Sequence, residues 1–134
     1  MSKNQPRSRP CPSCPYRQDV PSGIWDASEY DKLTTYDGAT AEQAMAGAFR
    51  PFFCHTEPEY LCGGWVGTHN MAENLAIRVN HQGLNIDAIL NYHTDVPLFG
   101  SGAEAAKHGR RDIDNPGPAA VRYIEKLINR RRGR

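Results

Sequence analysis

The sequence predicts a mainly α-helical, irregular and loop-rich small domain with little or no sheet. Apolar residues recur at helical spacing through the second half, and no series of alternating apolar and polar residues indicates strands. The 134 residues include 12 glycines and 10 prolines, so much of the chain must be loop. A loop-rich chain of this length benefits from a cross-link, either a disulfide or a bound metal ion.

The predicted organisation is a disordered basic tail over residues 1–10, one domain over 11–129 and a basic tail over 130–134. The opening "MSKNQPRSRP" is polar and lacks the apolar core of a signal peptide. No window approaches the roughly 20 apolar residues of a membrane span. We therefore expect a cytoplasmic protein with no membrane association, in which thiols stay reduced. The net charge of +1 gives no strong overall field towards nucleic acid or membrane.

The first half of the domain begins with a proline-rich loop, "CPSCPYRQDVPSG", which excludes a regular helix or central strand. Asp26, with Glu29 three residues later, then predicts a capping box that opens a helix to about Leu33. Trp25, Tyr30 and Leu33 would supply the buried side of this helix. Residues 41–48 have helical propensity interrupted by glycine, and "FRPFFCH" is at best an edge strand.

The second half carries clearer helical signals. Apolar residues from Trp65 to Val79 recur at helical spacing, with a stop at Gly83, and "NIDAILNY" adds a short segment. In "SGAEAAKHG", Ser101 caps a helix, Glu104 completes its capping box, and the second glycine ends it. A last helix starts at "NPGP" and carries an apolar stripe: Ala120, Val121, Ile124, Leu127 and Ile128.

Four cysteines form the strongest functional signal, as C-x2-C, 39 intervening residues, then C-x7-C. The residues are Cys11, Cys14, Cys54 and Cys62. Two such arms can complete the tetrahedral thiolate site of structural zinc, although the second arm is looser than the common spacing. Four thiolates also suit an iron–sulfur cluster, in which ligand spacing varies more widely. We predict that these four cysteines bind one zinc ion, with an iron–sulfur cluster as the alternative.

Other interpretations of the cysteines stay open. A free cysteine often packs as a small apolar residue, and a C-x2-C pair can be a redox pair, although the accompanying βαβ pattern is missing. Cys54 with the adjacent His55 could be a nucleophile and base, but such partners usually meet through the fold. His55 or His69 could also replace one thiolate ligand. Pro15, after the second cysteine, has no N–H to offer sulfur, which is more typical of ferredoxin-type runs.

The basic C-terminus offers a second candidate site. Arg130, Arg131, Arg132 and Arg134 could contact phosphates of a nucleic acid or an acidic partner, although cations also stabilise a helix C-terminus. No phosphate loop, nucleophile elbow or paired-carboxylate motif indicates catalysis, so an enzyme is the less favoured expectation. We expect a binding or regulatory module whose partner, an unidentified protein, meets Tyr16, Trp25, Tyr30 and these arginines.

Several blocks of the sequence resemble a known family. "CPSCPYRQDVPSGIWDASEYDKLTTYD", "FFCHTEPEYLCGGWVGTH", "LAIRV" and "VPLFGSGAEAAKHG" are similar to small actinobacterial and actinophage proteins catalogued as domain of unknown function 6283. The similarity covers about residues 11–110. It implies a cytosolic protein of bacterial or phage origin, with four cysteines that act together and no established activity.

Overall fold

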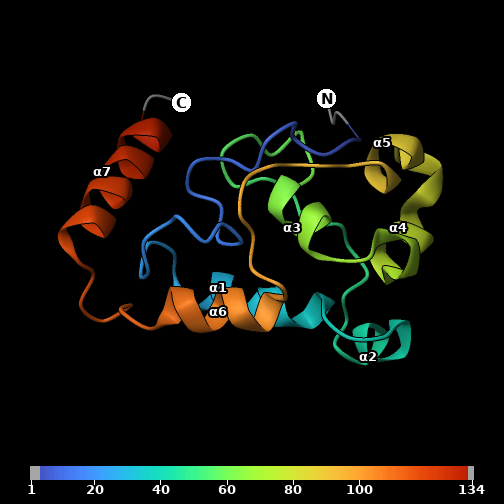
Figure 1. The fold of residues 1–134 in the computed structure, drawn as a ribbon, viewed down its shortest axis with the longest axis horizontal. Helices are drawn as coiled ribbons and strands as arrows, with labels where there is room; N and C mark the ends of the chain where they lie inside the picture. The colour runs from blue at the N-terminus through green and yellow to red at the C-terminus, as the bar shows by residue number, and fades with distance from the viewer. Residues whose placement is uncertain (1–3, 133–134) are drawn as a thin grey trace.

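The structure, a computed structural model, describes residues 4–132. Within that range the chain is mainly α-helical, as the sequence predicts, and contains isolated β-bridges rather than a sheet. The helices are α1 (Ala27–Leu33), η1 (Thr34–Tyr36), α2 (Thr40–Met45), α3 (Gly63–Thr68), η2 (Met71–Glu73), α4 (Leu75–Asn80), η3 (His81–Gly83), α5 (Ile86–Leu90), α6 (Gly102–Arg110) and α7 (Pro118–Arg132). α1 and α6 lie side by side, α3 lies centrally, and α7 stands at one end (Figure 1).

Side-chain caps start the helices that the sequence predicts most clearly. Asp26 accepts a hydrogen bond from the N–H of Ser28 at α1, and Ser101 accepts one from the N–H of Glu104 at α6. The predicted capping boxes, however, do not close. The Glu29 carboxylate pairs with Lys32 and His55, and the Glu104 carboxylate accepts from the N–H of Gly100. Helix α6 also continues one residue past the predicted stop at Gly109.

The apolar pattern from Trp65 to Val79 does not form one helix. Asn70 and Asn74 each accept hydrogen bonds from backbone N–H groups two or three residues ahead, which starts η2 and α4 separately. Asparagine favours such caps because its short side chain competes with the helical backbone for hydrogen bonds. Val79 consequently lies outside the core, with 57% of its surface exposed.

Aromatic and aliphatic side chains fill the core, which depends on close contact between α1 and α6. Tyr30 and Leu33 of α1 are buried, as predicted. A Cβ atom added at Gly109 would lie 2.0 Å from Cε1 of Tyr30. A Cβ atom at Gly102 would lie within 1.9 Å of the carbonyl oxygen of Leu33. Glycine at both positions therefore allows the two helices to approach more closely than any other residue would.

Residues 4–10, for which the sequence predicts a disordered tail, contact the middle of the chain. Leu61 donates its N–H to the carbonyl of Gln5 and accepts from the N–H of Arg7. Leu61 also forms an antiparallel bridge with Phe53. Pro6, which forms a parallel bridge with Leu61, is buried together with it. Residues 1–3 and Arg134 lie outside the described residues.

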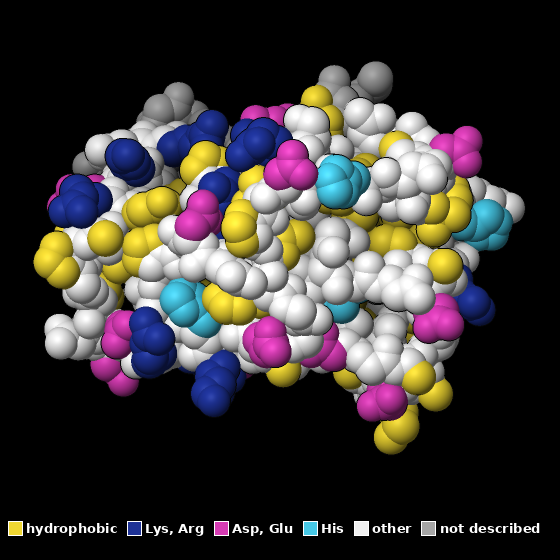
Figure 2. Space-filling model, viewed as in Figure 1, with side chains coloured by type: hydrophobic (Ala, Val, Ile, Leu, Met, Phe, Trp, Pro, Cys, Tyr) yellow, Lys and Arg dark blue, Asp and Glu magenta, His cyan; other side chains and the backbone are white. Residues whose placement is uncertain are grey.

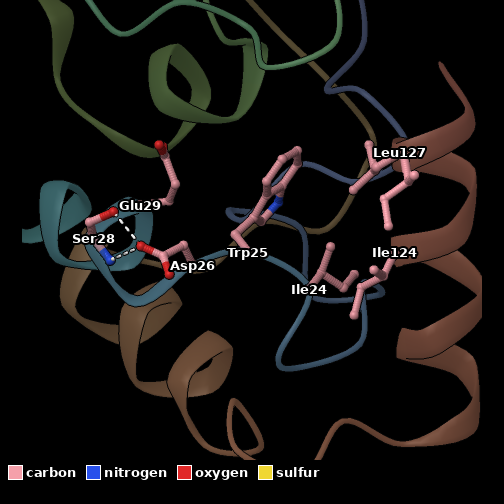
Figure 3. A pocket seen from close by; sticks show the side chains of 8 residues that line it. Ile24, Trp25, Asp26, Ser28, Glu29, Ile124 and Leu127 are labelled. Atoms are coloured by element: carbon pink, nitrogen blue, oxygen red, sulfur yellow. Dashed lines mark hydrogen bonds between the residues drawn. The ribbon is translucent and has the colours of Figure 1, made fainter. Parts of the chain in front are cut away.

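Helix α7 packs against the loop that precedes α1. Ala120 is buried, and Ile124 and Leu127 face Ile24 and Trp25 across a cavity of about 350 Å³ (Figure 3). The predicted apolar stripe is thus only partly buried, because Val121 and Ile128 remain exposed. Among the described residues, no helix is long and apolar enough to cross a membrane.

From the close contact between α1 and α6 we predict how much stability is lost when one methyl group is added there. Gly109→Ala should lower the free energy of unfolding by about 1–3 kcal/mol, because the Tyr30 ring must shift to admit the new Cβ atom. Urea denaturation followed by circular dichroism measures this loss. Gly83→Ala is the control, since its Cβ atom would have no neighbour within 4 Å. Equal midpoints for the two variants would contradict the described packing.

Candidate metal centre

The structure brings the four cysteines together in the interior. Their side chains are buried and unbridged, and Sγ of Cys14 lies 3.7 Å from Sγ of Cys62. The thiol of Cys11 interacts with that of Cys54, which forms a second pair. The two pairs adjoin, because one hydrogen-bonded turn carries both Cys11 and Cys14. Within residues 4–132, no group of three or more Cys, His, Asp or Glu side chains is arranged so that it could hold a metal ion.

Local turns position the first arm of the cluster. In "CPSC", the N–H of Cys14 bonds to the carbonyl of Cys11 at 2.9 Å, and the N–H of Arg17 bonds to the carbonyl of Cys14 at 3.1 Å. These two turns point both thiols inwards from a segment that would otherwise be polar loop. Gly64 of α3 then admits Cys14, since a Cβ atom at position 64 would lie only 2.4 Å from its sulfur.

Backbone pairing positions the second arm. The N–H of Cys54 bonds to the carbonyl of Tyr60, and the N–H of Cys62 bonds to the carbonyl of Phe52. These bonds flank the bridge between Phe53 and Leu61, so the chain reverses between the two cysteines. The C-x7-C spacing is longer than that of a usual metal-binding turn. The short antiparallel contact nevertheless brings the two cysteines close together.

Hydrogen-bond donors surround the sulfur atoms. The N–H of Trp65 donates to Sγ of Cys62, and the N–H of Glu57 donates to Sγ of Cys54, both at 3.4 Å. The hydroxyl of Thr56 lies 3.4 Å from Sγ of Cys54, and that of Ser13 lies 3.8 Å from Sγ of Cys11. Such donors stabilise sulfur in its thiolate form. The two hydroxyls are not apparent in the sequence as part of a site, because the spacing of the cysteines does not indicate which neighbours point inwards.

The pKa values of the cysteines are shifted in different directions. The hydrogen bond from Cys11, together with those from Thr56 and Glu57, lowers the pKa of Cys54 to about 5. The same bond to Cys54, followed by burial, raises the pKa of Cys11. Burial, followed by the hydrogen bond with Cys14, raises the pKa of Cys62. Without a cation the cluster thus favours protonated Cys11 and Cys62, because several buried thiolates would repel one another.

Arg17 is a cation held against the backbone of the cysteine loop. Its guanidinium bonds to the carbonyl of Pro10 at 3.1 Å and reaches that of Cys11 at 3.5 Å. Two further bonds of 2.8 Å join it to the carboxylate of Asp19. Arg17 therefore fixes the backbone of the cysteine loop, and it shares its charge with a neighbouring acid.

The two histidines considered as substitute ligands are engaged elsewhere. Nε2 of His55 lies 2.7 Å from the carboxylate of Glu29, and its ring stacks on Trp25. Nε2 of His69 lies 3.0 Å from Asp37, and Nδ1 lies 2.9 Å from the carbonyl of Trp65. Each histidine thus joins separate segments of the fold.

The prediction that three aromatic residues face a partner is wrong. Tyr16, Trp25 and Tyr30 are buried, because their rings fill the space between the cysteine loop and the helices. Arg130 is exposed on α7, Arg131 and Arg132 lie in the last turn of that helix, and Arg134 is beyond the described residues.

Fold and site together define a small helical domain with a buried cluster of four cysteines. The chain belongs to the family described as a family of unknown function (DUF6283), whose pattern matches residues 6–132. No curated protein and no solved structure matches the chain.

The contact between Gly64 and Cys14 gives a test of the cluster. Gly64→Ala should lower the free energy of unfolding by about 1–3 kcal/mol, since the new methyl group would overlap the Cys14 sulfur and Cβ of Tyr16. Gly67→Ala, on the same helix, should cost less, because the atom it meets is the flexible end of Leu98. Urea denaturation in the presence of reductant measures both. A smaller loss at Gly64 than at Gly67 would argue against the described position of Cys14.

Proposed function

We propose that the protein is a small cytoplasmic metal-binding protein, of bacterial or phage origin, with a structural zinc site formed by Cys11, Cys14, Cys54 and Cys62. The zinc would fasten the N-terminal loop to the middle of the chain. The domain held in this way would act as a binding or regulatory module. The proposal assigns no reaction to the site.

One distance carries the proposal. Zinc–thiolate bonds are about 2.3 Å long, so two sulfurs of a tetrahedral site lie about 3.8 Å apart. The sulfurs of Cys14 and Cys62 lie 3.7 Å apart. A disulfide would need about 2.05 Å. This pair is therefore spaced as two ligands of one ion would be, and movement of the Cys11–Cys54 pair towards it would complete the set.

The chemistry of the donors supports the same reading. Four buried thiols lie together, and their thiolate forms would repel one another unless a cation neutralised them. Divalent zinc would supply that charge and displace the remaining protons. The N–H groups of Glu57 and Trp65 point at the sulfurs of Cys54 and Cys62 and would stabilise their thiolate forms. Because the closed loop between the two arms is long, the cross-link would restrict many conformations of the unfolded chain.

An iron–sulfur protein with a redox or sensor role is the second candidate. The arrangement in two pairs favours it, because in a two-iron cluster each iron binds two protein ligands. Such a cluster would also place two irons and two sulfides between the pairs. A single ion needs less room between the two pairs, which favours zinc.

Elemental analysis of protein purified anaerobically tests the proposal. We expect about one zinc per chain, a colourless solution, and loss of the metal when any one of the four cysteines is changed to serine. His55→Gln and His69→Gln are matched controls, and both should keep the metal. Iron and inorganic sulfide in a coloured protein would establish the second candidate. Metal-free protein with four titratable thiols would exclude both.

Zinc binding also predicts how stability depends on pH. The zinc-bound folded state holds deprotonated thiolates, whereas the unfolded chain keeps its thiols protonated at neutral pH. The unfolded state then binds more protons, so the free energy of unfolding should rise with pH and fall as the solution is acidified.

Thermal unfolding at a series of pH values, with zinc release followed by a chromogenic chelator, measures this dependence. Zinc-free protein with all four cysteines changed to serine is the control and should lack the cysteine contribution to the slope. An unchanged slope in that control would contradict thiolate ligation.

A further inference from the structure

Basic side chains from two distant parts of the chain gather on one face of the molecule. Figure 2 shows Lys and Arg side chains clustered where the N-terminal segment approaches α7. We call this surface the basic band. Its members are four exposed cations, Arg9, Arg122, Lys126 and Arg130, and the half-buried Arg17.

Helix α7 supplies a regular row of charges. Arg122, Lys126 and Arg130 are spaced by four residues, so they lie along one side of the helix, and all three are exposed. The side that contacts the core carries Ala120, Ile124 and Leu127, while the exposed Val121 and Ile128 lie on another flank. The row spans about 12 Å, since the helix rises 1.5 Å per residue.

The N-terminal segment continues this row. Figure 1 shows the N-terminal segment beside α7, and Tyr123 of this helix packs against the core cluster that includes Tyr16. Arg9 is exposed, whereas the Arg17 side chain is only 16% exposed and is paired with Asp19. Asp19 and Glu125 are exposed acidic residues near the band.

We propose that the basic band binds the phosphate backbone of double-stranded DNA. A row of cations about 12 Å long matches the width of the major groove of B-DNA, so it can reach phosphates on both sides. The nearby Tyr16 is buried and Tyr123 is half-buried, so the band lacks the exposed aromatic rings on which single-stranded bases stack.

The inference builds on the proposed binding module, because Arg17 is held by the carbonyls of Pro10 and Cys11. A metal that fixes the cysteine loop would therefore also fix one end of the band. The row on α7 does not depend on that loop for its spacing. DNA binding and metal binding can consequently fail separately.

Fluorescence anisotropy with a labelled 20-base-pair duplex tests the inference. With about four phosphates contacted, the logarithm of the binding constant should fall with the logarithm of salt concentration at a slope of about −3.6. Binding should therefore weaken by about 150-fold between 50 and 200 mM NaCl. Arg122→Gln/Lys126→Gln/Arg130→Gln should abolish most of the affinity and flatten the slope.

A matched pair of lysines makes the test specific. Lys126→Gln should reduce the slope by about 0.9. Lys107→Gln, which changes an exposed lysine of α6, should leave it unchanged. Equal effects of the two substitutions would overturn the proposal, as would no duplex binding at 50 mM NaCl. Tighter binding of oligo(dT), or equal binding of polyglutamate, would also overturn it, by assigning the band to single strands or to acidic proteins.

Zinc content measured on the same samples separates the two proposals. The triple variant that keeps zinc but loses DNA affinity supports the band alone. Wild-type protein that binds the duplex without any bound metal supports the band and overturns the metal centre. Zinc-loaded protein that does not bind the duplex overturns the proposed DNA site but still supports the metal centre.

Discussion

The approach of Cys14 to Cys62 is the contact on which the arrangement of the rest depends. It joins a proline-rich loop that has no regular secondary structure to the start of α3, the central helix. Tyr16 follows that loop into the core, and Trp65 follows Cys62 into the same space. Both rings are fully buried beside the sulfurs. Burial of the two rings and contact between the sulfurs therefore stabilise the same junction between the loop and α3, and each depends on the other for its position.

A second chain of polar contacts connects this junction to the helices. His69, just after α3, bonds to Asp37, and the Asp37 carboxylate accepts from the N–H groups of Gly102 and Ala103 at the start of α6. One carboxylate thus satisfies a histidine and the end of a helix together. This contact couples the segment that carries Cys62 to the α1–α6 pair.

The sequence predicts what local chemistry determines. Asp26 and Ser101 mark helix starts because their caps act within three residues, and the four cysteines form a recognisable set because thiols are rare in this chain. What the sequence cannot predict depends on distant partners. Glu29 fits a capping box locally, yet its carboxylate bonds to His55, which is 26 residues away. The approach of Cys54 to Cys62 likewise depends on the backbone pairing of Phe53 with Leu61, which the spacing of cysteines does not predict.

The glycine at position 64 links two parts of the sequence that an alignment would treat as independent. The space that a side chain would need there is already filled by the Cys14 sulfur and by Cβ of Tyr16. Chains with this fold should therefore vary at the two positions jointly: a residue larger than glycine in α3 and a cysteine at the end of the "CPSC" turn should exclude each other.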